Sequence, residues 1–120
     1  MPYGLPDEQW QPAKEEIRRI LISRAGAGQP PITYSELVVQ LTSVTLEYFK
    51  DPLFHLLGEI SEEESAAGRG MLSAMVVTAE DGRPGSGFFA LGEDLGFDTS
   101  DPEKSWCSQM TEVYEYWSKH

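Results

Sequence analysis

Apolar residues recur at every third or fourth position in several stretches of the chain, the spacing that places side chains on one face of a helix. Two stretches predict helices over about residues 7–25 and 52–67, each followed by a glycine that favours a helix end. A last helix is predicted from Pro102, with Ser100 or Asp101 as its cap. The apolar stripe of this helix consists of Trp106, Met110, Val113 and Trp117.

Three local signals refine this pattern. Thr33 and Glu36 form a capping box, in which each side chain satisfies a backbone donor at the start of a helix, so a helix is predicted directly after the extended pair Ile32-Thr33. Pro12 lacks a backbone donor, and we therefore place the regular part of the first helix from Pro12 onward. Residues 42–51 are β-branched and aromatic, which leaves extended, irregular and helical structure open, and we treat them as irregular.

Two short apolar runs predict strands near the middle of the chain. The run at residues 75–78 is rich in β-favouring side chains, and the run at residues 88–91 is its expected partner in a two-stranded hairpin. Between them, Asp81-Gly82 and Pro84-Gly85 are typical of turns and predict a glycine-rich wing. Residues 92–101 are then an acidic linker to the last helix.

The order of these elements predicts the fold. Helix, short strand, two helices and a two-stranded hairpin is the order of an α+β winged helix-turn-helix, extended here by a C-terminal helix over a single domain, residues 1–120. The same elements also fit another small α+β arrangement. The large aromatic stripe of the last helix is expected to pack across the core or against a second subunit, which makes a homodimer through this helix an option.

Composition narrows the class of protein. The chain has 120 residues, of which 40% are hydrophobic, and this is enough for one core without metals or cross-links. Cys107 is the only cysteine, so neither an internal disulfide nor a cysteine-based zinc site is available. No apolar run approaches the roughly 20 residues that cross a bilayer. We expect a cytoplasmic protein of bacterial type that binds neither a membrane nor a cofactor.

The charge of the chain points to a kind of partner. The formal net charge is -11, and residues 51–103 hold twelve acidic side chains against only Arg69 and Arg83. Four glutamates of the third predicted helix could imitate a phosphate array and bind a basic protein, as an inhibitor, immunity or regulatory protein would. The simpler alternative is a solvated helix face, and a metal site is a third. These glutamates are Glu59, Glu62, Glu63 and Glu64.

A family resemblance supports the fold. The segment Ile32-Thr33-Tyr34-Ser35-Glu36-Leu37 is similar to the opening of the winged-helix domain of alkylguanine-DNA alkyltransferases. Val76-Val77, Asp81-Gly82 and the glycines up to Phe88 resemble that family's paired valines and glycine-rich wing. The family's reactive proline-cysteine-histidine-arginine is replaced here by Leu72-Ser73-Ala74-Met75. The resemblance therefore implies the fold, but alkyl transfer does not carry over.

A DNA-binding protein is the alternative function, either a transcription regulator or a catalytically silent relative of the alkyltransferases. The candidate backbone contacts are Arg18 and Arg19 on the first helix and Arg83 in the loop. The strongly acidic character of the third helix disfavours nucleic acid, because the resembled family carries an arginine there. Salt bridges within the first helix explain its basic group more simply.

Catalysis has only weak candidates in this sequence. Cys107 with His55 or His120 could form a nucleophile and base, but no third residue is in place to orient the base. Residues 82–87 could cradle a phosphate, but they lack the lysine of a phosphate-binding loop and are not expected between a strand and a helix. We therefore expect a protein that is not an enzyme and holds no metal.

Overall fold

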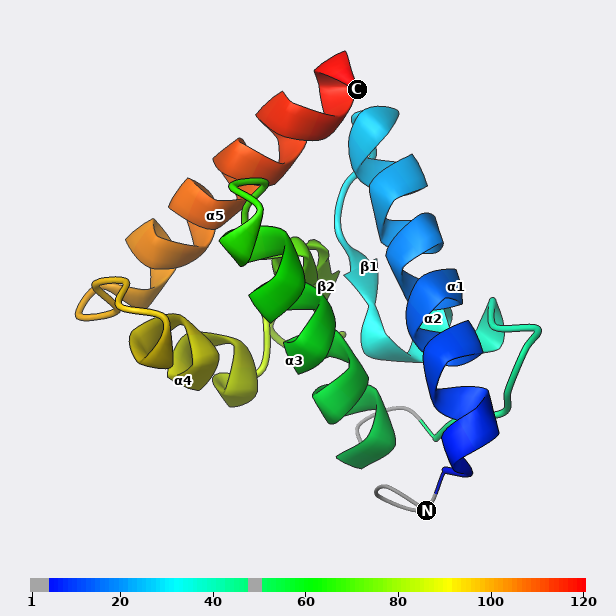
Figure 1. Ribbon diagram of the computed structural model, residues 1–120. Helices are drawn as coiled ribbons and strands as arrows, with labels where there is room; N and C mark the ends of the chain where they lie inside the picture. Colours follow the sequence, from blue (N-terminus) through cyan, green and yellow to red (C-terminus); the bar gives the residue numbers. More distant parts are fainter. Residues whose placement is uncertain (1–4, 48–50) are drawn as a thin grey trace.

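The computed structural model describes residues 5–47 and 51–120. In this part of the chain, most residues are helical and two short strands pair with each other. The elements, in chain order, are α1 (Asp7–Gly26), β1 (Ile32–Thr33), α2 (Tyr34–Val39), α3 (Asp51–Ala66), the 3₁₀ turn η2 (Leu72–Met75), β2 (Val76–Val77), α4 (Ser86–Asp94) and α5 (Pro102–Lys119). Figure 1 shows α1 and α5 converging at their C-terminal ends, with α3 between them and α4 beside α3.

The predicted helices are confirmed where their local signals were strong. The Thr33 side chain accepts the backbone N–H of Glu36, and the Glu36 side chain accepts the backbone N–H of Thr33, so the capping box is complete. Asp101 caps α5 by accepting the N–H of Lys104. Helix α1 is nevertheless continuous from Asp7 and contains Pro12, so the predicted late start of its regular part is wrong.

The predicted hairpin is wrong. Residues 88–91 lie in helix α4, and β2 pairs in parallel with β1, with Ile32 opposite Val76. Four consecutive apolar residues fit one strand or one helical turn equally well, so this run alone could not decide between them. In the helix, Phe88 and Leu91 are three positions apart and share a face. Residues 92–94 therefore continue α4 rather than begin a linker.

Two apolar clusters hold the elements together. The main core combines fully buried side chains from α1, α3, η2 and α5, with Ile17, Leu53, Ile60, Leu72 and Val113 among them. A smaller cluster of Met71, Ala74 and Phe88 fixes α4 and receives Trp106 and Met110 from α5. The fold thus belongs to the α+β class, with helices packed around a small parallel sheet.

Helix α5 packs across the core of its own chain. Gln109 Oε1 accepts the buried backbone N–H of Met71 at 2.9 Å, and Trp106 Nε1 donates to the carbonyl of Ala74 at 2.9 Å. Val113 is completely buried. The stripe predicted from the sequence therefore finds its contacts within the molecule, while a homodimer stays a prediction.

The segment after α2 is irregular as far as residue 47, in agreement with the prediction. Residues 48–50 of the predicted irregular stretch lie outside the described part of the chain, and Asp51 already belongs to α3. Glu16 of α1 anchors this segment by accepting the backbone N–H and hydroxyl groups of Thr42 and Ser43. Burial raises the pKa of Glu16, but these hydrogen bonds outweigh burial and lower the pKa to about 2. Hydrogen bonds to a single carboxylate thus hold this segment in place, although it contains no helix or strand.

None of the helices among residues 5–47 and 51–120 is long and apolar enough to span a membrane.

Candidate functional site

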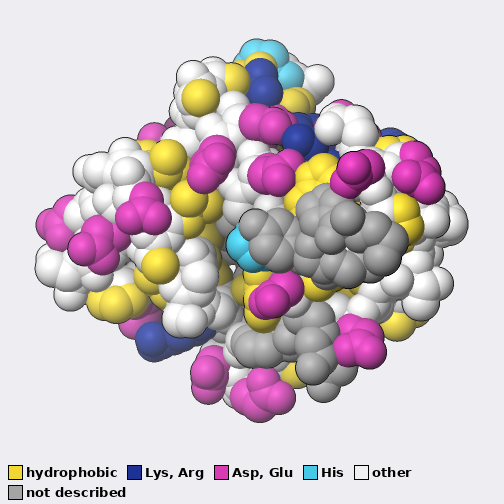
Figure 2. Space-filling view, turned by 60° about the horizontal axis from the view of Figure 1, so that its bottom comes forward, with side chains coloured by type: hydrophobic (Ala, Val, Ile, Leu, Met, Phe, Trp, Pro, Cys, Tyr) yellow, Lys and Arg dark blue, Asp and Glu magenta, His cyan; other side chains and the backbone are white. Residues whose placement is uncertain are grey.

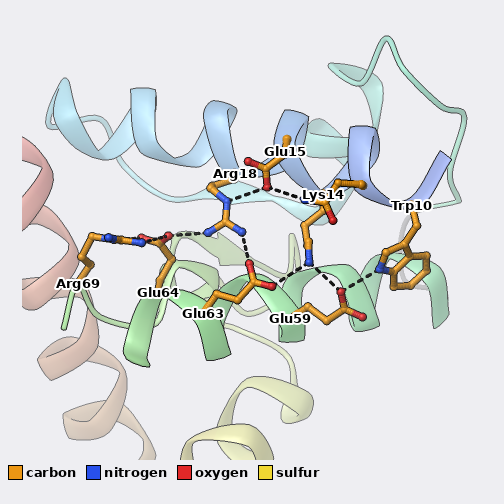
Figure 3. Close-up of polar contacts among 9 residues, drawn as sticks. Trp10, Lys14, Glu15, Arg18, Glu59, Glu63, Glu64 and Arg69 are labelled. Atoms are coloured by element: carbon orange, nitrogen blue, oxygen red, sulfur yellow. Dashed lines mark hydrogen bonds and ion pairs between the residues drawn. The ribbon is translucent and has the colours of Figure 1, made fainter. Parts of the chain in front are cut away.

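Three of the four predicted acidic residues pair with basic side chains of helix α1 (Figure 3). Lys14 Nζ lies 3.1 Å from Glu59 Oε1 and 2.8 Å from Glu63 Oε2, and Arg18 pairs with Glu63 as well. Trp10 Nε1 donates to Glu59 Oε1 at 2.9 Å. Most of the expected acidic face is therefore neutralised by α1.

Glu64 lies deepest in this cluster, with its side chain only 1% exposed. It accepts Arg18 Nη1 at 2.5 Å on one side and Arg69 Nε at 2.8 Å on the other. A buried carboxylate needs such partners, because an unpaired charge would be strongly destabilising there. Glu64 is consequently a structural residue that joins α1, α3 and the turn after α3.

The pKa directions agree with this pairing. Burial lowers the pKa of Lys14, but its hydrogen bonds to Glu63 and Glu59 outweigh burial and raise it above 10.5. The hydrogen bond from Lys14 lowers the pKa of Glu63 below 4.5, against a smaller effect of burial. Lys14 and Glu63 are thus both charged near neutral pH and stabilise each other in that state.

Glu62 differs from its neighbours because it is exposed and points away from α1 toward α4. Among the described residues, no lysine or arginine pairs with Glu62. It is the member of the predicted acidic set whose carboxylate is available to a partner.

The three candidate DNA contacts are placed separately. Arg18 is occupied by Glu15, Glu63 and Glu64. Arg83 lies 3.4 Å from Glu103 at the start of α5. Arg19 is exposed on α1. The contacts of the described residues do not bring these arginines together as one basic patch.

A groove of about 580 Å³ lies between α3 and α4. Its apolar lining comes from both helices, mainly Phe54, Leu57, Phe88 and Leu91, and its acidic lining residues are Asp51, Glu59, Glu62 and Asp94. Figure 2 shows hydrophobic atoms beside a hollow between α4, on the left, and the centre of the view, with acidic side chains on either side. Lys and Arg side chains appear in this view only toward the top and at the lower left.

Two residues that were compared with the family line the groove: Tyr34 belongs to a matching segment, and Ser73 belongs to the replaced motif. Tyr34 OH accepts the backbone N–H of Gly85 at 2.9 Å, and burial raises the pKa of Tyr34 above 10. Ser73 also lines the groove, and its hydroxyl lies 2.6 Å from that of Ser61. Tyr34 therefore fixes the loop before α4, and Ser73 stands at the second position of the replaced reactive motif.

Sequence reasoning missed this groove because it assigned the wall formed by α4 to a strand. The available signal was the three-residue spacing of Phe88 and Leu91, followed by Asp94 three residues later. That spacing would have placed the three side chains on one helical face. The groove could not be predicted without it.

The structure also shows where the weaker candidates for metal binding, catalysis and phosphate binding lie. Within residues 5–47 and 51–120, no three His, Cys, Asp or Glu side chains are arranged to hold a metal ion. Cys107 is exposed on α5 and does not line the groove in which His55 lies. His120 stacks on Tyr116 with ring centroids 3.9 Å apart. Residues 82–85 do lie between strand β2 and helix α4, and residues 86 and 87 begin α4, so the expectation that this segment would not lie between a strand and a helix is wrong.

No family model, no curated protein and no solved structure matches this chain.

Proposed function

We propose that this protein is a non-catalytic protein-binding module whose α3–α4 groove receives a segment of a basic partner. The observation that carries the proposal is an apolar groove with an acidic rim and with no lysine or arginine among the described lining residues. An inhibitor, an immunity protein and a regulatory subunit would all use such a surface.

The charge of the rim favours a basic partner. Asp51, Glu62 and Asp94 are exposed, and none of the ion pairs within the described residues includes them. Glu59 also lines the groove, but Lys14 already neutralises it. Complementary charge speeds association and selects partners, while the apolar contacts supply most of the affinity.

The apolar lining supplies a reason for binding beyond charge. Phe54 is 37% exposed, although it is a large hydrophobic residue, and Leu57 and Phe88 lie beneath the rim. Apolar surface of this kind, bordered by charged residues, is typical of interaction sites. A fully solvated acidic face would not require such a lining.

A titration followed by NMR tests this proposal. Isotope-labelled protein is mixed at low salt with a synthetic peptide that has leucines on one helical face and lysines on the other. Shifts confined to residues of α3 and α4 that line the groove are expected. The same peptide with glutamates in place of its lysines is the control, and equal binding of both peptides, or shifts only outside the groove, would contradict the proposal.

A DNA-binding function is the second candidate. Tyr34 and Gly85, from the two segments that resemble the alkyltransferases, line the same groove, which favours a silent relative of that family. In this candidate function, the elements from α1 to β2 are interpreted as a winged helix that lacks the predicted hairpin. Adding duplex DNA to the labelled protein at low salt separates the two functions, because phosphate contacts are strongest there. Shifts caused by DNA but not by the lysine peptide would favour the second candidate.

A further inference from the structure

Gly58 lies in the middle of α3 and lines the groove. Glycine is unfavourable inside a helix compared with alanine, because it has more conformational freedom to lose on folding. A Cβ atom added at Gly58 would have no described atom within 4 Å, so the packing of this part of the fold does not require glycine.

Gly70 shows what a glycine required by the fold looks like. Its φ is +87°, and an added Cβ would lie 3.1 Å from Val113 Cγ2 and 3.3 Å from the backbone nitrogen of that residue. Helix α5 packs directly over Gly70 for this reason. Gly58 has neither a left-handed backbone nor a close neighbour of that kind.

We propose that the occupant of the α3–α4 groove is an amphipathic helix of the partner, with basic side chains toward the rim, which crosses α3 at Gly58. This inference rests on the proposed function and names the form of the ligand. A missing side chain at the crossing point lets two helices approach closely. Gly87 and Ala90 of α4, on the opposite wall, are also small.

The backbone chemistry of the groove favours a helix over an extended strand. A strand needs partners for its own N–H and C=O groups, which it usually finds at the edge of a sheet. Neither β1 nor β2 lines the groove, and the interior residues of α3 and α4 use their backbone N–H and C=O groups within those helices. A helix brings its own hydrogen bonds and needs only apolar and charged contacts.

The length of the groove sets the length of this helix. Lining residues of α3 extend from Asp51 to Glu62, with Phe54, His55 and Gly58 between them at helical spacing. At about 1.5 Å per residue this is roughly 16 Å, or three helical turns. Carboxylates stand toward both ends of this stretch, so the basic residues of the partner are expected toward both ends of its helix.

Two peptides and two leucine variants test the inference. The peptides have the same leucines and lysines; one repeats leucine at helical spacing, and the other alternates the two residues, which suits a strand. Gly58→Leu fills the groove, and Ala66→Leu adds the same side chain at an exposed position of α3 outside it. We expect the helical peptide to bind about tenfold more tightly than the alternating one.

Gly58→Leu is expected to weaken the binding of the helical peptide at least about tenfold. The melting temperature of the variant protein should be unchanged or a few degrees higher, since leucine favours helix more than glycine. Ala66→Leu is expected to leave the affinity unchanged. Equal binding of the two peptides, or full affinity in Gly58→Leu, would overturn the helical occupant.

The two proposals fail in different ways. If Asp94→Lys weakens the binding of both peptides equally and Gly58→Leu weakens the binding of neither, the groove binds a basic segment but not as a helix that crosses α3 at Gly58. If no variant of the groove weakens either peptide, or if neither peptide binds, both proposals are overturned.

Discussion

Glu16 shows how one side chain can organise a segment that has no regular structure. Its two oxygens accept hydrogen bonds from four donors of Thr42 and Ser43, at distances from 2.7 to 3.0 Å. Charged hydrogen bonds of this kind are stronger than neutral ones. The chain that leads from α2 toward α3 is consequently tied to α1.

The lowered pKa of Glu16 predicts how stability depends on pH. The pKa of Glu16 in the folded protein, about 2, lies below the ordinary value of 4.5. The ionised group therefore stabilises the fold fully at a pH above the ordinary pKa. This contribution is lost as the pH falls toward the folded value. Glu16→Gln is expected to lower the free energy of unfolding by about 2 kcal/mol near neutral pH.

Urea titrations over a range of acid pH check this prediction. The difference between the wild type and Glu16→Gln should shrink as the pH approaches the folded pKa. Glu115→Gln, an exposed change on α5, is the control and should differ little from the wild type at any pH. A difference for Glu16→Gln that stays constant with pH would disprove the role of its ionised form.

At the residue level, the sequence predicted features that depend on near neighbours. Thr33 and Glu36 are three positions apart, and their capping box could be identified without a fold. The partners of Glu63 could not, because Lys14 and Arg18 lie on another helix. One signal was available: Lys14 and Arg18 are four positions apart, as are Glu59 and Glu63, so the two helices carry matching stripes of opposite charge.

At the level of elements, the ion pairs fix α3 against α1 and against the turn after α3. Glu64→Met is expected to lower the free energy of unfolding by about 2 kcal/mol, because Arg18 and Arg69 lose their buried partner. Arg18→Met combined with Glu64→Met should cost less than the sum of the single changes. We expect a coupling energy of about 1 kcal/mol or more.

Urea unfolding of the four proteins of this double-mutant cycle measures the coupling energy. Glu62→Gln is the control, since Glu62 is exposed and lies outside the ion pairs of the described residues; it should change stability by less than about 0.5 kcal/mol. Additive effects of Arg18→Met and Glu64→Met would show that the two side chains do not stabilise each other.

Helix α5 depends on a polar contact as well as on its apolar stripe. Gln109→Ala leaves the buried N–H of Met71 without its acceptor and should lower the free energy of unfolding by about 2 kcal/mol. Ser108→Ala, an exposed neighbour on the same helix, is the matched control. Thermal unfolding of both variants checks this, and equal melting temperatures would contradict the observed docking of α5.

Element prediction succeeded where a pattern was long and failed where it was short. Helices α1, α3 and α5 carry their apolar spacing over several turns. The run at residues 88–91 is only one helical turn long, so its spacing could not separate helix from strand. The pairing of β1 with β2 joins Ile32 to Val76 although α2, α3 and η2 lie between them in the sequence, and no local pattern contains that information.

For the whole molecule, the distribution of charge matters more than its sum. Part of the net charge of -11 is compensated where α3 meets α1, whereas Asp51, Glu62 and Asp94 border an apolar groove without a lysine or arginine in its described lining. The acidity predicted from the sequence is thus divided into a structural part and a part available to a partner. The groove itself follows from the packing of α4 and could not be derived from composition.

The affinity of the lysine-containing helical peptide for Asp94→Lys and for Glu93→Lys tests the central claim most directly. The two exposed acids are neighbours on α4, so both changes alter the net charge and the end of the helix alike, but only Asp94 lines the groove. We predict about tenfold weaker binding for Asp94→Lys at low salt, little change for Glu93→Lys, and a smaller difference at high salt. Equal affinities of the two variants would contradict a binding site in this groove.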